Sequence, residues 1–192
     1  MLRVKRLSAL FQAVTLTLLS FQELSSADFS PREEHATSAL SSAFVGLGYV
    51  SDGGLSNENE MDVSEIKAWG GVVVYRSLTG LTDNFKLTLI ESKSIEVLKT
   101  VYGDNNVSVT AGGDTHVEVK AEDPQEGVFV FDLVLRGGIA KRIVIQDGAI
   151  TSRDEITYND SDPIGYGVTI SAYPDGNGKT HDEYIEGQTI SG

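Results

Sequence analysis

The stretch KRIVIQDGAITSRDEITYNDSDPIGYGVTISAYP, residues 141–174, indicates the fold class of this chain. Its apolar side chains alternate with polar ones, which is the pattern of strands with one buried face. Asp147-Gly148 predicts a tight hairpin turn, because both residues tolerate the backbone angles that such turns need. Ile156 and Tyr158 continue a second strand, and residues 164–172 keep strict period two as a third. We therefore predict three antiparallel strands that form a scaffold without evident chemistry.

The composition indicates a folded protein with limited chemistry. The chain has 192 residues, enough for one well-cored domain with appendages, and 40% of them are hydrophobic. It contains no cysteine, which excludes disulfides, thiolate metal sites and cysteine nucleophiles. The formal net charge of -13 argues against a protein that grips nucleic acid through clustered lysine and arginine. Solubility is the simplest explanation of this charge.

The first 43 residues differ in character from the rest. Basic residues within the first six positions precede an apolar run over residues 7–21, and small residues follow at Ser25, Ser26 and Ala27. This layout is typical of a secretory signal peptide. The apolar run is too short and too polar to span a bilayer as a helix. The alternative is an N-terminal arm that packs against a partner, followed by a linker.

The middle of the chain predicts further strands and one helix. Strands are expected around residues 44–50, 63–69, 71–77, 85–89, 107–109, 117–119 and 128–136. From about Ser94 to Tyr102 the apolar spacing changes to three and four residues, with serine placed to cap the helix and Gly103 to end it. Both faces of 128–136 are largely apolar, so we expect this strand between two neighbours. The predicted fold is mainly β, an antiparallel β-sandwich or small barrel with one packed α-helix.

The segment 56–62 is strongly acidic. Glu58, Glu60 and Asp62 alternate along it, so an extended conformation would place them on one side. A divalent-cation site is one interpretation, but the segment lacks the glycine and the final glutamate of a calcium loop. A solvated or subunit-facing loop fits better. Trp69 is the only tryptophan, a residue that usually anchors a core or an interface, and it joins the three carboxylates as a candidate subunit contact.

No arrangement of residues predicts catalysis. The sequence has no phosphate-binding glycine loop, zinc-protease helix or nucleophile elbow. Its histidines, at 35, 116 and 181, fall in different turns or polar faces, and His181 lies in a segment, 175–184, that predicts a polar loop and tail. A catalytic site needs a constellation of groups. We therefore expect a protein that is not an enzyme and has no cofactor and no metal site.

Six segments carry a resemblance to a known family. They are residues 47–54 (LGYVSDGG), 65–71 (EIKAWGG), 85–91 (FKLTLIE), 101–103 (VYG), 141–148 (KRIVIQDG) and 168–175 (VTISAYPD). In this order and spacing they resemble the major tail tube proteins of long-tailed (siphovirus-type) bacteriophages, especially those of actinobacterial phages and prophages. The resemblance covers residues 44–184.

The resemblance implies a β-sandwich or small barrel with one packed helix, in a structural virion protein. It also implies hexameric rings that stack into a phage tail tube, through which DNA is delivered to the host. The implied partners are other copies of the chain and tail proteins such as the tape measure, terminator and baseplate components. DNA would pass without specific binding, and carboxylates lining the channel would repel its phosphates, which fits the acidic charge. No membrane partner is implied.

The N-terminal segment departs from the family pattern, which begins with a short strand rich in glycine, alanine and valine. Tail tubes assemble in the bacterial host cytoplasm, so the resemblance favours an arm over a signal peptide and a location in the virion tail. We divide the chain into an atypical arm or leader-like segment (1–43), a tail-tube β-sandwich domain (44–184) and a C-terminal tail (185–192). The alternative function is a secreted β-sandwich binding module, with residues 1–27 as its signal peptide. A carboxylate-dependent hydrolase is a weaker alternative.

Overall fold

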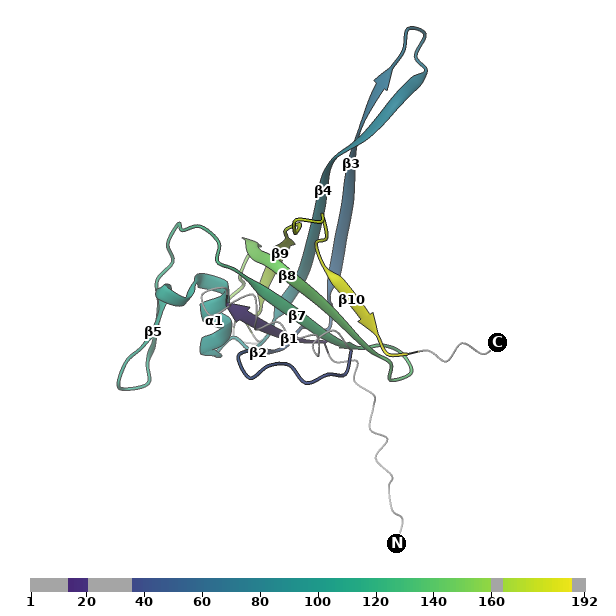
Figure 1. The fold of residues 1–192 in the computed structure, drawn as a ribbon. Helices are drawn as coiled ribbons and strands as arrows, with labels where there is room; N and C mark the ends of the chain where they lie inside the picture. The colour runs from purple at the N-terminus through teal and green to yellow at the C-terminus, as the bar shows by residue number, and fades with distance from the viewer. Residues whose placement is uncertain (1–13, 21–35, 160–163, 188–192) are drawn as a thin grey trace.

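The computed structural model describes residues 14–20, 36–159 and 164–187, which are mainly β (Figure 1). In chain order the elements are β1 (Val14–Ser20), β2 (Val45–Tyr49), β3 (Ser56–Lys67), β4 (Val73–Leu89), α1 (Ile95–Tyr102), the short 3-10 turn η3 (Asp104–Asn106), β5 (Val107–Val109), β6 (Thr115–Val117), β7 (Glu126–Val134), β8 (Ala140–Arg153), β9 (Tyr166–Ala172) and β10 (Asp182–Ile185). The predicted fold class, antiparallel β with one packed helix, is confirmed.

The main sheet is antiparallel and has the strand order β2-β1-β7-β8-β9-β4-β3. β7 pairs with one edge of β8, while β10 and β9 pair with successive halves of its other edge. A bridge between Val50 and Leu89 joins the β2 end of the sheet to β4. Within the described ranges this contact is a single bridge and does not extend into a continuous ladder. The sheet therefore does not close into a barrel, and it curves around a core as in a β-sandwich.

The core lies on the inner face of this sheet. Period-two alternation turns Phe85, Leu87 and Leu89 of β4 to that face, and Phe85 stacks on Phe131 of β7 with 5.8 Å between ring centroids. The helix α1 contributes Val97, Leu98 and Val101. Because an eight-residue helix is marginal alone in water, this packing is what stabilises it.

The helix has the caps that the sequence predicts. The Ser94 hydroxyl accepts a hydrogen bond from the Val97 N–H at 3.5 Å. Gly103 follows the last turn at φ 100°, in the region that favours glycine, and its N–H donates to the Lys99 carbonyl at 2.7 Å. Both ends of the helix are therefore specified locally.

β7 is covered on both faces and both edges, as its apolar pattern predicts. It lies between β1 and β8, so residues 14–20 of the N-terminal segment contribute a strand to the same sheet as the rest. On the face away from the main core, Val128, Val130 and Val144 form a second small cluster with Leu40 and Phe44 packed against it.

The predicted Asp147-Gly148 hairpin is wrong. β8 runs without interruption through both residues, and Gly148 pairs with Gly127 of β7 and Ala172 of β9. A Cβ on Gly148 would lie 2.9 Å from Ile145 Cγ2, so the glycine allows close packing and does not form a turn. The stretch 141–174 consequently holds two long strands, and Ile156 and Tyr158 lie outside any strand.

The predicted polar tail from residue 175 is also wrong in part. Residues 182–185 form β10, which pairs with β8 from Lys141 to Val144. His181, just before it, is largely buried and lies edge-on against Phe85 with 5.1 Å between ring centroids. The C-terminal segment is therefore part of the folded body as far as Ile185.

Candidate subunit-contact surface

A long β-hairpin extends from the body of the molecule (Figure 1). β4 pairs with β9 only from Asn84 to Leu89, and β3 has β4 as its partner along its whole length. We call residues 60–82 the arm, which is separate from the N-terminal arm considered above. In these residues the two strands have only each other as neighbours among the described strands. A two-stranded ribbon of this kind is marginally stable by itself in water.

The arm carries the main concentration of exposed large apolar side chains in the described chain. They are Met61, Val63, Ile66, Trp69, Val72, Val74, Tyr75 and Leu78, each more than half exposed. Val63 and Leu78 are cross-strand partners, and so are Ile66 and Tyr75, which lie on the opposite face of the ribbon. Apolar residues therefore occupy both faces of an element that the body does not cover. Contiguous exposed patches of this kind mark interaction sites.

Trp69 lies at the tip of the arm, in the turn between β3 and β4. The Ala68 N–H donates to the Val72 carbonyl at 2.8 Å, which closes the turn. Gly70 and Gly71 both have positive φ, 101° and 87°, where a side chain would be strained. The indole is fully exposed, at 106% of its reference area. Trp69 therefore does not contribute to the core of the described chain.

The acidic segment is a strand and not the loop that we predicted. Glu58, Glu60 and Asp62 lie in β3, and their alternation places them on one face, as expected. The Lys86 ammonium donates to Glu58 Oε2 at 2.7 Å. Trp69 is seven residues beyond Asp62, roughly 23 Å along an extended strand, so the four candidates do not form one cluster. The subunit-contact role of all four stays a prediction.

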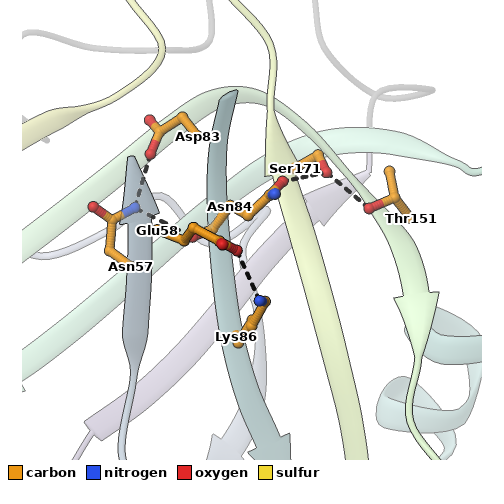
Figure 2. Close-up of polar contacts among 7 residues, drawn as sticks. All are labelled: Asn57, Glu58, Asp83, Asn84, Lys86, Thr151 and Ser171. Atoms are coloured by element: carbon orange, nitrogen blue, oxygen red, sulfur yellow. Dashed lines mark hydrogen bonds and ion pairs between the residues drawn. The ribbon is translucent and has the colours of Figure 1, made fainter. Parts of the chain in front are cut away.

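These carboxylates belong to a larger polar face, on the opposite side of the sheet from the core. Figure 2 shows Glu58 together with Asn84, Lys86, Thr151 and Ser171 of this face. The polar face comprises Glu58, Glu60 and Asp62 of β3, Asn84 and Lys86 of β4, Thr169 and Ser171 of β9, and Thr151 of β8. Three carboxylates against one lysine leave it acidic.

Hydrogen bonds across three strands stabilise this face. The Ser171 hydroxyl donates to Asn84 Oδ1 at 2.7 Å, and Thr151 therefore donates to Ser171, at 2.8 Å. The hydrogen bond and charge of Glu58 raise the pKa of Lys86 above its usual 10.5, so the lysine is fully charged. The polar face thus consists of short hydroxyl and amide side chains together with charged side chains.

The described residues show neither a metal site nor a membrane-spanning helix. In the described ranges, no three histidine, aspartate or glutamate side chains are grouped to hold a metal ion. The same ranges contain no helix with the length and apolar character that crossing a bilayer requires.

Sequence reasoning missed two parts of the surface. The apolar side chains of the arm were assigned to ordinary strands, although apolar residues on both faces around Gly70-Gly71 were the available signal. His181 was assigned to a tail, and no local pattern predicts its contact with β4. The candidate N-terminal residues Ser25, Ser26 and Ala27 lie outside the described residues.

Comparison with known proteins identifies a family. The family model described as phage tail tube protein matches residues 21–190. Among solved structures, the chain is similar to the tube-terminating cap of the anti-feeding prophage (9% identity, TM-score 0.46, covering 97% of this chain and 96% of that one). It is also similar to the sheath/tube terminator of the extracellular contractile injection system PVC (9%, 0.46, 96% and 100%) and to an Hcp protein (11%, 0.34, 92% and 99%). No curated protein matches the sequence.

Proposed function

Because the chain belongs to the phage tail tube protein family and is a structural tail protein, we propose that it assembles into stacked rings through which phage DNA reaches the host. The ring number that the sequence resemblance implies is six. The observation that carries the proposal is the arm, an apolar two-stranded ribbon that the body leaves uncovered. Burial against a second copy would stabilise both the ribbon and the ring.

The charge on β3 favours a head-to-tail contact. β3 is an edge strand in the described sheet, and exposed edges are templates for pairing with another chain. Two β3 edges that met each other would bring Glu58, Glu60 and Asp62 of both copies close together, which is unfavourable for like charges. A heterologous contact between β3 and a different surface of the next copy avoids this repulsion. Repeated around an axis, such a contact closes a ring.

The polar face is the surface that we assign to the channel wall. Its carboxylates would repel phosphate. Its hydroxyl and amide groups Thr151, Ser171 and Asn84 hydrogen-bond to one another. Lys86 is paired with Glu58. DNA would therefore pass along this face without being held.

The remaining elements of the proposal follow from the family. The subunit would contact other copies of itself and tail components such as the tape measure, terminator and baseplate proteins. It would assemble in the bacterial host cytoplasm and reside in the virion tail. The function would be mechanical and would require no cofactor.

Electron microscopy and native mass spectrometry of the purified full-length chain test the assembly. Rings or tubes with one subunit number are expected, and a protein that remains monomeric at high concentration would contradict the proposal. The double variant Val63→Ser with Leu78→Ser removes one apolar pair of the arm and should abolish the rings. Val119→Ser, which removes an exposed valine elsewhere, should leave them intact.

A further inference from the structure

A buried carboxylate lies at the root of the arm. Asp83 precedes Asn84, the first β4 residue that pairs with β9, so it occupies the step at which the ribbon leaves the body. Its side chain has no exposed area. The next residues outward, from Thr82 toward the tip, are partly or fully exposed. Asp83 therefore marks the boundary between the packed and the free part of β4.

Side chains from two separate parts of the chain bind this carboxylate. Asn57 Nδ2, from β3, donates to Oδ1 at 2.8 Å, and His181 Nδ1, from the segment before β10, lies 2.6 Å from Oδ2. The Asn59 and Thr180 side chains lie beside the carboxylate and also lower its pKa. An ionised carboxylate only accepts, so Nδ1 of His181 carries the proton and donates it. Figure 2 shows the contact between Asn57 and Asp83.

The His181 side of this cluster is anchored in the body. β10 begins at the next residue, Asp182, and pairs with β8. The His181 ring also lies at 89° to Phe85 in the core. Asn57 and Asp83, in contrast, belong to the two strands that continue into the arm. The carboxylate consequently joins the arm to a body segment that is far away in sequence, since Asp83 and His181 are 98 positions apart.

We propose that this cluster is a clamp in which Asp83 and His181 are positioning residues that fix the direction of the arm relative to the body. Without the clamp, the arm would be connected to the body mainly through the continuing backbones of β3 and β4 and the pairing of β4 with β9 from Asn84 onward. A ribbon attached in this way can bend at its root. The clamp removes that freedom before a second copy arrives, and a preorganised contact element binds more tightly than a mobile one. Only this last consequence rests on the proposed function.

Distance measurements between spin labels test the clamp in single subunits. The chain has no cysteine, so Val72→Cys at the tip of the arm and Ser152→Cys on β8 provide the only label sites. Dilution with unlabelled protein isolates the distance within one subunit. A single narrow distribution is expected for the otherwise unchanged chain, and a broad one would overturn the proposal.

Substitutions at His181 distinguish the effect of its hydrogen bond to Asp83 from the effect of its packing. His181→Leu removes the donor and should broaden the distribution, whereas His181→Asn places an amide N–H near the position of Nδ1 and should keep it narrow. His116→Leu changes an exposed histidine outside the cluster and should have no effect. A narrow distribution in His181→Leu, or equal broadening in His181→Asn and His181→Leu, would overturn the assignment.

Thr180→Val is a milder variant that retains the shape of the side chain while it removes one donor to Asp83. If His181→Leu does not fold, Thr180→Val can be measured in its place. It should broaden the distance distribution less than His181→Leu does. Ring formation by the unmodified chain is scored separately by microscopy. Failure of that assembly would count against the proposed function and leave the clamp standing, because the distances are measured within one subunit.

Discussion

Lys86 Nζ lies 2.7 Å from Oε2 of Glu58, across the β3–β4 ladder and on the face of the sheet away from the core. Both side chains are exposed, so we expect the pair to contribute less than about 1 kcal/mol to stability. Its consequence is electrostatic, because it neutralises the lysine of the polar face. The net charge of the polar face is therefore negative and comes from Glu60 and Asp62.

Reversing that charge should make assembled tubes bind DNA. With Glu60→Lys and Asp62→Lys together, tubes should retain short duplex DNA at low salt and release it as salt rises, whereas unmodified tubes should not retain it. Fluorescence anisotropy of labelled DNA at several salt concentrations measures this. Asp114→Lys with Asp123→Lys makes the same change of charge elsewhere on the surface. Equal DNA retention by both double variants would contradict the assignment of the polar face to the channel.

Trp69→Ala should weaken assembly and leave the subunit stable. The indole is fully exposed in one chain, so its loss should change the free energy of unfolding by no more than about 0.5 kcal/mol. If it is buried in a contact, its loss should cost about 2 kcal/mol or more, roughly a thirtyfold rise in the concentration at which rings form. Sedimentation across a concentration series measures the shift. An unchanged concentration would remove Trp69 from the contact.

Gly148→Ala should destabilise the fold. A Cβ there would lie 2.9 Å from Ile145 Cγ2, 3.2 Å from the Ser171 carbonyl oxygen and 3.4 Å from Phe129 Cδ2. Because overpacking a core commonly costs about 1–3 kcal/mol, the denaturant midpoint should fall. Gly176→Ala is the matched control, since a Cβ at that position meets no atom within 4 Å. If the two variants unfolded at the same denaturant concentration, the close packing around Gly148 would not contribute to stability.

Stability should fall in acid through Asp83. Burial alone would raise the pKa of this carboxyl, but hydrogen bonds from Thr180, Asn57, His181 and Asn59 outweigh it and hold the pKa below the ordinary 3.8. A group with a lowered folded-state pKa contributes its full stabilisation above 3.8 and loses it as the pH falls from there through the folded-state pKa. Unfolding in denaturant from pH 7 to pH 2.5 should show this loss, and Asp83→Asn should lack it. Parallel curves for the two proteins would contradict the prediction.

The N-terminal segment should remain in the mature protein. Removal of residues 1–27 would delete β1, whose seven residues pair with both β2 and β7. Mass spectrometry of the mature chain determines its first residue. An N-terminus that begins after Ala27 would support the secreted binding module and count against assembly in the cytoplasm.

Features that depend on near neighbours along the chain could be predicted from the sequence. Period two in residues 85–89 predicted a strand with one buried face, and the spacing in Ser94–Tyr102, with serine before it and Gly103 after it, predicted the helix and its ends. The apolar residues of 128–136 predicted a strand enclosed on both sides. Each of these patterns is decided by backbone geometry and burial within about ten residues, so it is visible without a fold.

Features that depend on partners distant in the chain became evident only in the folded structure. Asp147-Gly148 has the composition of a turn, yet it continues β8, because Gly148 pairs there with Gly127 of β7 and Ala172 of β9. The arm exists because β9 ends its pairing at Asn84 while β3 and β4 continue. His181 is largely buried where it meets Asp83 and Phe85, which are both far away in the chain. No local pattern encodes these contacts, since each arises only when segments remote in sequence are brought together.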